Sequence, residues 1–199
     1  MGSPTKETSM NKLVLLAPIL ASACIVGAGD SANSAAQAVS AADCPAGVPA
    51  SLAPAADQDL AFALDATGVQ KYTCNASGTW VFVAPEADLG HNGQVFVHHY
   101  AGPTWEWLDG STVVGAKVAG AAVDPTAIPW LLLRATSHGA IDGKMSDISS
   151  IQRLVTTGGL APAGACTPGD TADVPYTAQY FFYRTKADHP ENNVRCGAP

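Results

Sequence analysis

The sequence predicts an all-β single domain, a sandwich or barrel of short antiparallel strands with little helix. Short β-prone runs alternate with clusters of turn residues from about Cys44 onward, a spacing typical of such folds. The 199 residues include 19 glycines and 14 prolines, which disfavour long helices. Hydrophobic residues make up 47% and charged residues 14% of the chain, so it can bury a core and is not disordered.

Nine runs rich in β-branched, aromatic and aliphatic residues are the expected strands, in chain order: Leu60–Leu64, Val69–Cys74, Thr79–Val83, Gln94–Tyr100, Thr104–Leu108, Thr112–Val118, Trp130–Ala135, Ile148–Thr156 and Thr177–Tyr183. Turns are expected between them, because Gly, Asn and Asp tolerate a positive φ, at Asp65–Gly68, Asn75–Gly78, Ala101–Pro103 and Asp109–Ser111. Helix is expected only as a turn or two around Pro85–Leu89.

Alternation along the strands assigns faces to the aromatic and histidine side chains. His99 shares a face with Val97 and is expected to point inward. Trp105 and Trp107 share a face, opposite Glu106, and are expected to fill the core. The last strand carries aromatics on both faces, which predicts a central strand covered on both sides: Phe181 and Tyr183 on one, Tyr180 and Phe182 on the other.

Residues 1–42 are expected to be a signal peptide followed by an Ala/Ser-rich tether, which leaves 43–199 as the folded domain. Lysines precede an uncharged run of 17 residues, Leu13–Gly29, which is shorter than a membrane-spanning helix of about 20 residues. Ala21–Cys24 resembles a lipoprotein box, in which Cys24 would carry the lipid; cleavage after Ala23, Ala38 or Ala42 is the alternative. We therefore expect an exported protein, secreted or periplasmic, with a lipid anchor if Cys24 is modified and with no transmembrane span.

The remaining cysteines are even in number, as expected for a disulfide-stapled exported domain. Cys44, Cys74, Cys166 and Cys196 allow three pairings. Because the ends of a domain often lie close together, we favour Cys44–Cys196 with Cys74–Cys166.

Five segments in this order carry a family resemblance: Gly68–Cys74, His99–Glu106, Ile128–Leu133, Ile151–Gly159 and Tyr176–Tyr183. Together they resemble DUF3455, a family of exported bacterial and fungal proteins of unknown function, over roughly Pro49–Tyr183. The resemblance implies export and a β-rich domain, and it brings no established activity. Some fungal members carry the label malate dehydrogenase. Residues 43–199 have no glycine-rich strand-to-helix turn, so we reject that label and expect no cofactor.

The candidate binding residues are His99, Trp105, Asp109 and Arg153, which concentrate in or near the distinctive motifs. A cation among apolar residues usually has a specific partner, and Asp109 or Asp147 is expected to pair with Arg153. A metal site would need His99 with Asp109 or Glu106, since the adjacent His98 faces the other way; a hydrogen-bonded structural His99 is favoured, and no metal is expected.

These observations favour a binding module of the cell envelope or extracellular space, for a small molecule, a glycan or an envelope component. The formal net charge of −7 argues against nucleic acid as the partner. The alternatives are a secreted hydrolase that uses His99 with Asp109 or Glu106, and a structural surface or coat protein. Neither a G-x-S-x-G nor an H-E-x-x-H motif is present, and we lean against an enzyme.

Overall fold

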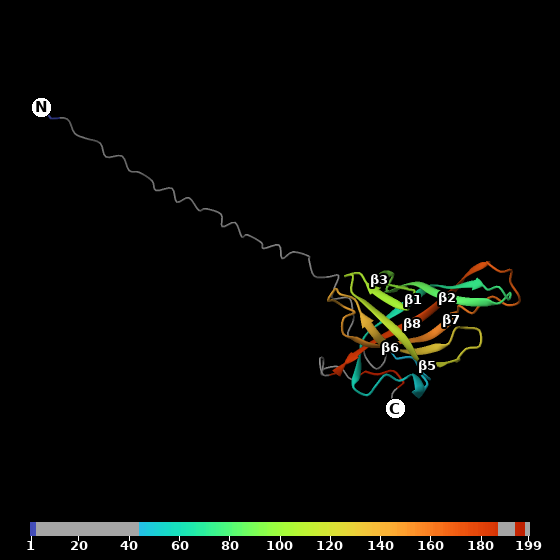
Figure 1. The fold of residues 1–199 in the computed structure, drawn as a ribbon. Helices are drawn as coiled ribbons and strands as arrows, with labels where there is room; N and C mark the ends of the chain where they lie inside the picture. The colour runs from blue at the N-terminus through green and yellow to red at the C-terminus, as the bar shows by residue number, and fades with distance from the viewer. Residues whose placement is uncertain (3–43, 187–193, 198–199) are drawn as a thin grey trace. The chain divides into compact units, whose positions relative to one another are not determined.

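The computed structural model describes residues 1–2, 44–186 and 194–197. The expected signal peptide, tether and lipidation site Cys24 therefore lie outside the described residues. Eight strands form one sheet (Figure 1): β1 Gln58–Cys74, β2 Trp80–His91, β3 Gln94–Tyr100, β4 Thr104–Trp107, β5 Thr112–Ala121, β6 Trp130–His138, β7 Ile148–Gly158 and β8 Thr171–Thr185.

Each strand pairs antiparallel with the next along the chain, and β8 returns to pair with β1, so the sheet closes into a barrel. The all-β prediction is confirmed, and the barrel is the correct one of its two forms. Within the described residues, the one complete helical element is the 3-10 turn η2 at Ala50–Leu52. No helix among them is long and apolar enough to cross a membrane.

The barrel interior is a packed aromatic and aliphatic core. Phe62 of β1 stacks on Phe182 of β8 with centroids 4.6 Å apart, and Trp107 lies edge-on to Phe62 at 5.2 Å. The side chains that close the core around them are fully buried, among them Leu89, Val97 and Ile151.

A second core lies against the outer face of the sheet. Phe181 and Tyr183 point into it, while Tyr180 and Phe182 point into the barrel, so the prediction of a strand covered on both sides is confirmed. Leu52 from the segment before β1 packs in this second core, and the Cys44–Cys196 disulfide ties the two ends of the domain over it.

The second disulfide joins Cys74, at the end of β1, to Cys166 in the β7–β8 connection. Both bonds follow the favoured pairing. Because disulfides persist in oxidising compartments, they indicate a location outside the cytoplasm.

Two local predictions were wrong. The expected turn at Asp65–Gly68 is a continuous part of β1, paired with β2 on one side and with β8 on the other, so eight strands replace the nine predicted. Gly68 is needed there for close approach, since a Cβ would lie 2.5 Å from the Cα of Ala87. The helix expected around Pro85–Leu89 is part of β2.

The short β3–β4 hairpin leaves the barrel wall open on one side. β2 pairs with β3 only over Ala87–His91, and β5 pairs with β4 only over Thr112–Val114. Residues 80–86 of β2 and 115–121 of β5 run beyond the hairpin and, in the described structure, pair only with β1 and β6. This gap gives access to the barrel interior.

Candidate functional site

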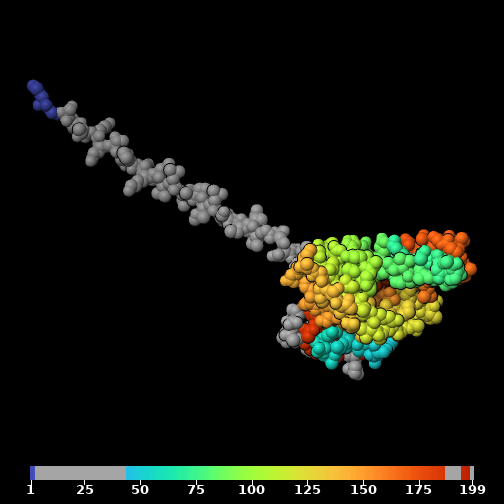
Figure 2. Space-filling model, viewed as in Figure 1, coloured from blue at the N-terminus to red at the C-terminus, as the bar shows by residue number. Residues whose placement is uncertain are grey.

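A cavity of about 360 Å³ lies behind the gap between β2 and β5. Phe82 and Val83 of β2, Lys117 of β5 and the hairpin residues Gly102 and Pro103 line its outer part. Figure 2 shows the opening as a hollow between the green surface of β2 and the yellow surface of the β5–β6 hairpin. A volume of this size is within the range of small-molecule sites.

The inner part of the cavity is lined by polar and aromatic side chains from five strands. These are Gln70 of β1, His99 of β3, Trp105 of β4, Arg153 of β7 and Tyr180 of β8. Three of the four residues singled out in the sequence, His99, Trp105 and Arg153, thus share one cavity. Whether they bind a ligand stays a prediction.

His99 and Trp105 form a rigid aromatic wall. They are cross-strand partners, and their rings stack with centroids 4.3 Å apart and planes 7° apart. Tyr180 lies edge-on to both rings, at 5.4 and 5.9 Å. Gly115 of β5 makes room for the indole, because a Cβ there would lie 3.0 Å from a ring carbon of Trp105.

His99 is held neutral inside the barrel. Burial lowers its pKa to about 3, against the opposing effect of its hydrogen bond to the Thr104 carbonyl; the charge of Arg153 lowers it further. Nδ1 lies 2.8 Å from the Thr104 carbonyl oxygen, which can only accept, so Nδ1 carries the proton. Nε2 of the neutral ring is therefore an acceptor.

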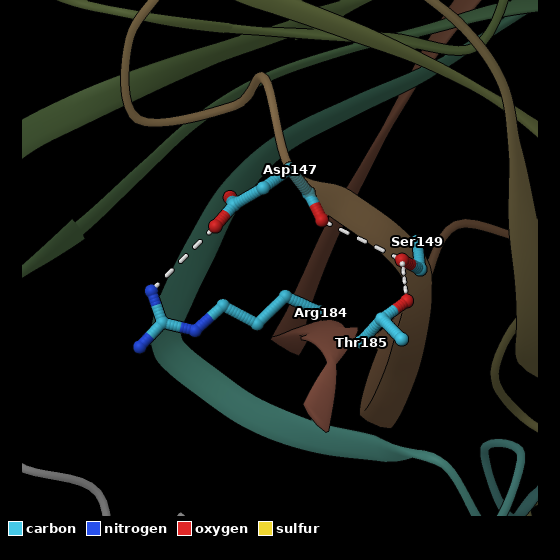
Figure 3. A network of polar contacts seen from close by, with 4 residues as sticks. All are labelled: Asp147, Ser149, Arg184 and Thr185. Atoms are coloured by element: carbon cyan, nitrogen blue, oxygen red, sulfur yellow. Dashed lines mark hydrogen bonds and ion pairs between the residues drawn. The ribbon is translucent and has the colours of Figure 1, made fainter. Parts of the chain in front are cut away.

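Arg153 has a different partner from the ones predicted. Its guanidinium donates from Nη2 to the Pro129 carbonyl at 2.9 Å, and it forms no ion pair with a carboxylate of the described residues. Asp147 instead pairs with Arg184 at 3.6 Å, in the network with Ser149 and Thr185 drawn in Figure 3. The prediction of an Asp109 or Asp147 partner was wrong, because the guanidinium of Arg153 donates to the backbone carbonyl of Pro129 in the loop before β6, and both carboxylates have other partners.

The charge of Arg153 shifts the pKa of the tyrosine hydroxyls around it. It lowers the pKa of Tyr72, Tyr176 and Tyr180, in each case against burial, which is the larger influence and raises the pKa. The guanidinium therefore lies close to a group of neutral rings.

Three buried donors of this cavity have no hydrogen-bond partner in the described structure: Gln70 Nε2, Trp105 Nε1 and Arg153 Nε. Gln70 is 3% and Trp105 1% exposed, so water outside the barrel does not compensate them. The side chain of Gln70 also lies close enough to the Tyr176 hydroxyl to act as a weak hydrogen-bond partner, a minor influence that lowers a pKa which burial raises, but this contact does not give Nε2 a well-formed hydrogen bond. An unpaired buried donor costs about 1–3 kcal/mol, so three on one cavity are unusual in a purely structural core.

The rest of the cavity wall is apolar apart from Lys117. Phe82, Val83 and Pro85 contribute from β2, and Leu131 and Leu133 from β6. Phe82 and Val83 are 49% and 57% exposed, large values for such side chains in a strand. The cavity thus combines inward-facing donors at its inner part with an apolar passage to the surface.

Asp109, the fourth predicted residue, lies in the β4–β5 turn, at the opposite end of the barrel from the β3–β4 hairpin. Its Oδ1 accepts from the Ser111 amide and hydroxyl, and its Oδ2 accepts from the Lys144 amide. Burial would raise the pKa of Asp109, but these hydrogen bonds together lower it below the usual value. Asp109 therefore fastens the β6–β7 loop, which contributes the buried Met145 to the core.

Glu106 is also separate from the cavity. It pairs across the strands with His98, on the face opposite His99, and accepts a hydrogen bond from Tyr100 at 2.9 Å. The hydrolase constellation of His99 with Asp109 or Glu106 is therefore not assembled. Among the described residues no group of three His, Cys, Asp or Glu side chains is close enough to hold a metal ion.

Sequence reasoning missed Gln70, Tyr180 and the apolar passage. Gln70 has the same parity as Phe62, Leu64 and Ala66, so a single strand over this region would have identified it as a buried polar residue. The expected turn at Asp65–Gly68 interrupted that pattern.

The family model for a protein of unknown function, DUF3455, matches residues 54–184, which span all eight strands but the last residue of β8. The chain belongs to the DUF3455 family. Comparison with curated proteins and with solved structures found no match. The DUF3455 match includes all the strands that line the cavity, and it assigns no activity to them.

Proposed function

We propose that this DUF3455 domain is a binding module that holds a small molecule inside its barrel and acts outside the cytoplasm, secreted or in the periplasm. The observation that carries the proposal is the set of unpartnered buried donors on an accessible cavity. Leaving such donors unpaired destabilises the free protein, and a ligand acceptor would remove that cost. The two disulfides support a site of action in an oxidising compartment.

The geometry supports binding better than catalysis. His99 is neutral and stacked on Trp105, and the carboxylates that could work with it lie on the outer face or at the other end of the barrel. General acid–base chemistry needs such groups within hydrogen-bond reach of one another or of a shared substrate. A rigid aromatic wall with fixed donors is instead typical of a preorganised ligand site.

A neutral apolar fluorophore, N-phenyl-1-naphthylamine, tests the proposal. We expect saturable fluorescence enhancement at one probe per chain. Val83→Trp puts a large side chain at the mouth and should weaken binding at least tenfold. Val118→Trp is the matched control, because Val118 is similarly exposed at 54% and does not line the cavity. Absence of saturable binding, or equal binding to both variants, contradicts the proposal.

A further inference from the structure

We infer that the ligand is a monocarboxylate with an apolar body, and that Arg153 binds its carboxylate. This inference rests on the proposed function, since it names the chemical class that the same cavity takes. It is carried by a separate observation, the charge of Arg153, which forms no ion pair with a carboxylate of the described residues.

The charge balance of the cavity favours an anion. The chain carries a formal net charge of −7, yet none of the described residues that line the cavity is Asp or Glu, while Arg153 and Lys117 both line it. Arg153 is half-buried among apolar and aromatic side chains, and a cation in such surroundings normally has an anionic partner. Among the described residues Arg153 donates to the Pro129 carbonyl and interacts with the Tyr180 hydroxyl, which are both uncharged, while its Nε is buried without an acceptor.

The donors specify the shape of the anion. A carboxylate has two oxygens that accept several hydrogen bonds, and a guanidinium binds it with fixed geometry. Three N–H donors that line the same cavity lack an acceptor: Arg153 Nε, Gln70 Nε2 and Trp105 Nε1. One negative charge balances the guanidinium of Arg153, whereas a phosphate dianion would need more positive charge than the inner part of the cavity offers.

The walls specify the rest of the molecule. Beyond the donors the lining consists largely of Phe82, Val83, Pro85 and the two β6 leucines, so the remainder of the ligand is aliphatic or aromatic. The exposed Lys117 at the opening adds a second positive charge on the path by which an acid would enter.

The test compares two ligands that share one skeleton, 1-naphthylacetate and the neutral 1-naphthylacetamide, by titration calorimetry at pH 7.5. The wild-type protein should bind the acid at least tenfold more tightly than the amide. Arg153→Gln, which keeps a donor for the Pro129 carbonyl but no charge, should reduce that preference to less than twofold, and Arg153→Lys should retain part of it.

Arg134→Gln is the matched control, because Arg134 is an exposed arginine of β6 that does not line the cavity; it should keep the full preference. Equal binding of acid and amide to the wild type overturns the carboxylate assignment and leaves the proposed function standing. Acid preference that survives in a folded Arg153→Gln protein overturns the role of Arg153. Binding of neither ligand, together with no binding of the neutral fluorophore, overturns both proposals.

Discussion

Acidification should destabilise this domain through His99 in a pH range where carboxylates contribute little. Burial holds the pKa of His99 at about 3 in the folded state, against about 6.5 in the unfolded chain. Between those values the unfolded state binds a proton that the folded state does not, so stability is complete above about pH 6.5 and falls as the pH decreases toward 3. The slope is about 1.4 kcal/mol per pH unit, which amounts to roughly 2.5 kcal/mol between pH 7.5 and pH 4.5.

The charged and titratable groups around His99 do not reverse this sign. Arg153 of β7 lies on the same cavity and opposes protonation of the ring. Tyr180 of β8 has a pKa raised by burial and stays neutral throughout the range. The hydrogen bond to Thr104 favours the protonated ring, but burial outweighs it.

Urea unfolding followed by tryptophan fluorescence at pH 7.5, 6.5, 5.5 and 4.5 measures this loss. His99→Asn is the reference variant, because its side-chain amide can still donate to the Thr104 carbonyl and does not titrate. The variant should be less stable than the wild type at pH 7.5, since it loses the stack on Trp105, and its stability should fall by about 2 kcal/mol less on acidification. Parallel pH profiles for the two proteins would refute the argument that His99 is buried in its neutral form.

Three further variants test other parts of the account. Replacing Cys44 and Cys196 together by alanine removes a cross-link of sequence separation 152. Because the unfolded chain is then less constrained, the free energy of unfolding in urea titrations should fall by about 5 kcal/mol. A loss under 1 kcal/mol would mean that the two ends of the domain stay docked without the disulfide. Gln70→Leu removes an unpaired buried amide and should raise the free energy of unfolding by about 1 kcal/mol. The same variant should bind 1-naphthylacetate severalfold more weakly. A loss of stability would instead indicate that the amide is satisfied in the free protein. Asp109→Ala should lower the free energy of unfolding by roughly 2 kcal/mol in the same assay, because Ser111 and Lys144 lose their acceptor. Its affinity for the fluorophore should stay within twofold of the wild type. A large change in affinity would mean that Asp109 takes part in ligand binding.

The sequence predicted the features that depend on strand alternation. Every second side chain of a strand faces the same way, so the two aromatic faces of β8 followed from parity, and the inward positions of His99 and Trp105 followed from parity together with the hydrophobic residues that share their faces. The disulfide pairing followed from the proximity of domain ends, which the barrel achieves by bringing the flanking segments together over its outer face.

The features that the sequence did not predict depend on neighbouring strands. Glycine is a typical turn residue, but Gly68 lies within β1 and lets the backbone of Ala87 approach closely. Ala87 belongs to β2, the next strand along the chain. A helical turn was expected at Pro85–Leu89, yet Pro85 lies in the part of β2 that pairs on one side only, where the missing N–H of a proline is tolerated. The cavity exists because the β3–β4 hairpin is shorter than the strands on either side of it, which follows from the lengths of four strands together.

The central claim is that the unpaired donors of the cavity bind an acceptor group of a small molecule. A crystal structure of the domain with 1-naphthylacetate tests it most directly. We predict the carboxylate within hydrogen-bond distance of Arg153 Nε, Gln70 Nε2 and Trp105 Nε1, and the naphthalene ring between Phe82 and the β6 leucines. A ligand bound outside the barrel, or a cavity in which those donors remain unpaired at saturating ligand, would contradict the claim.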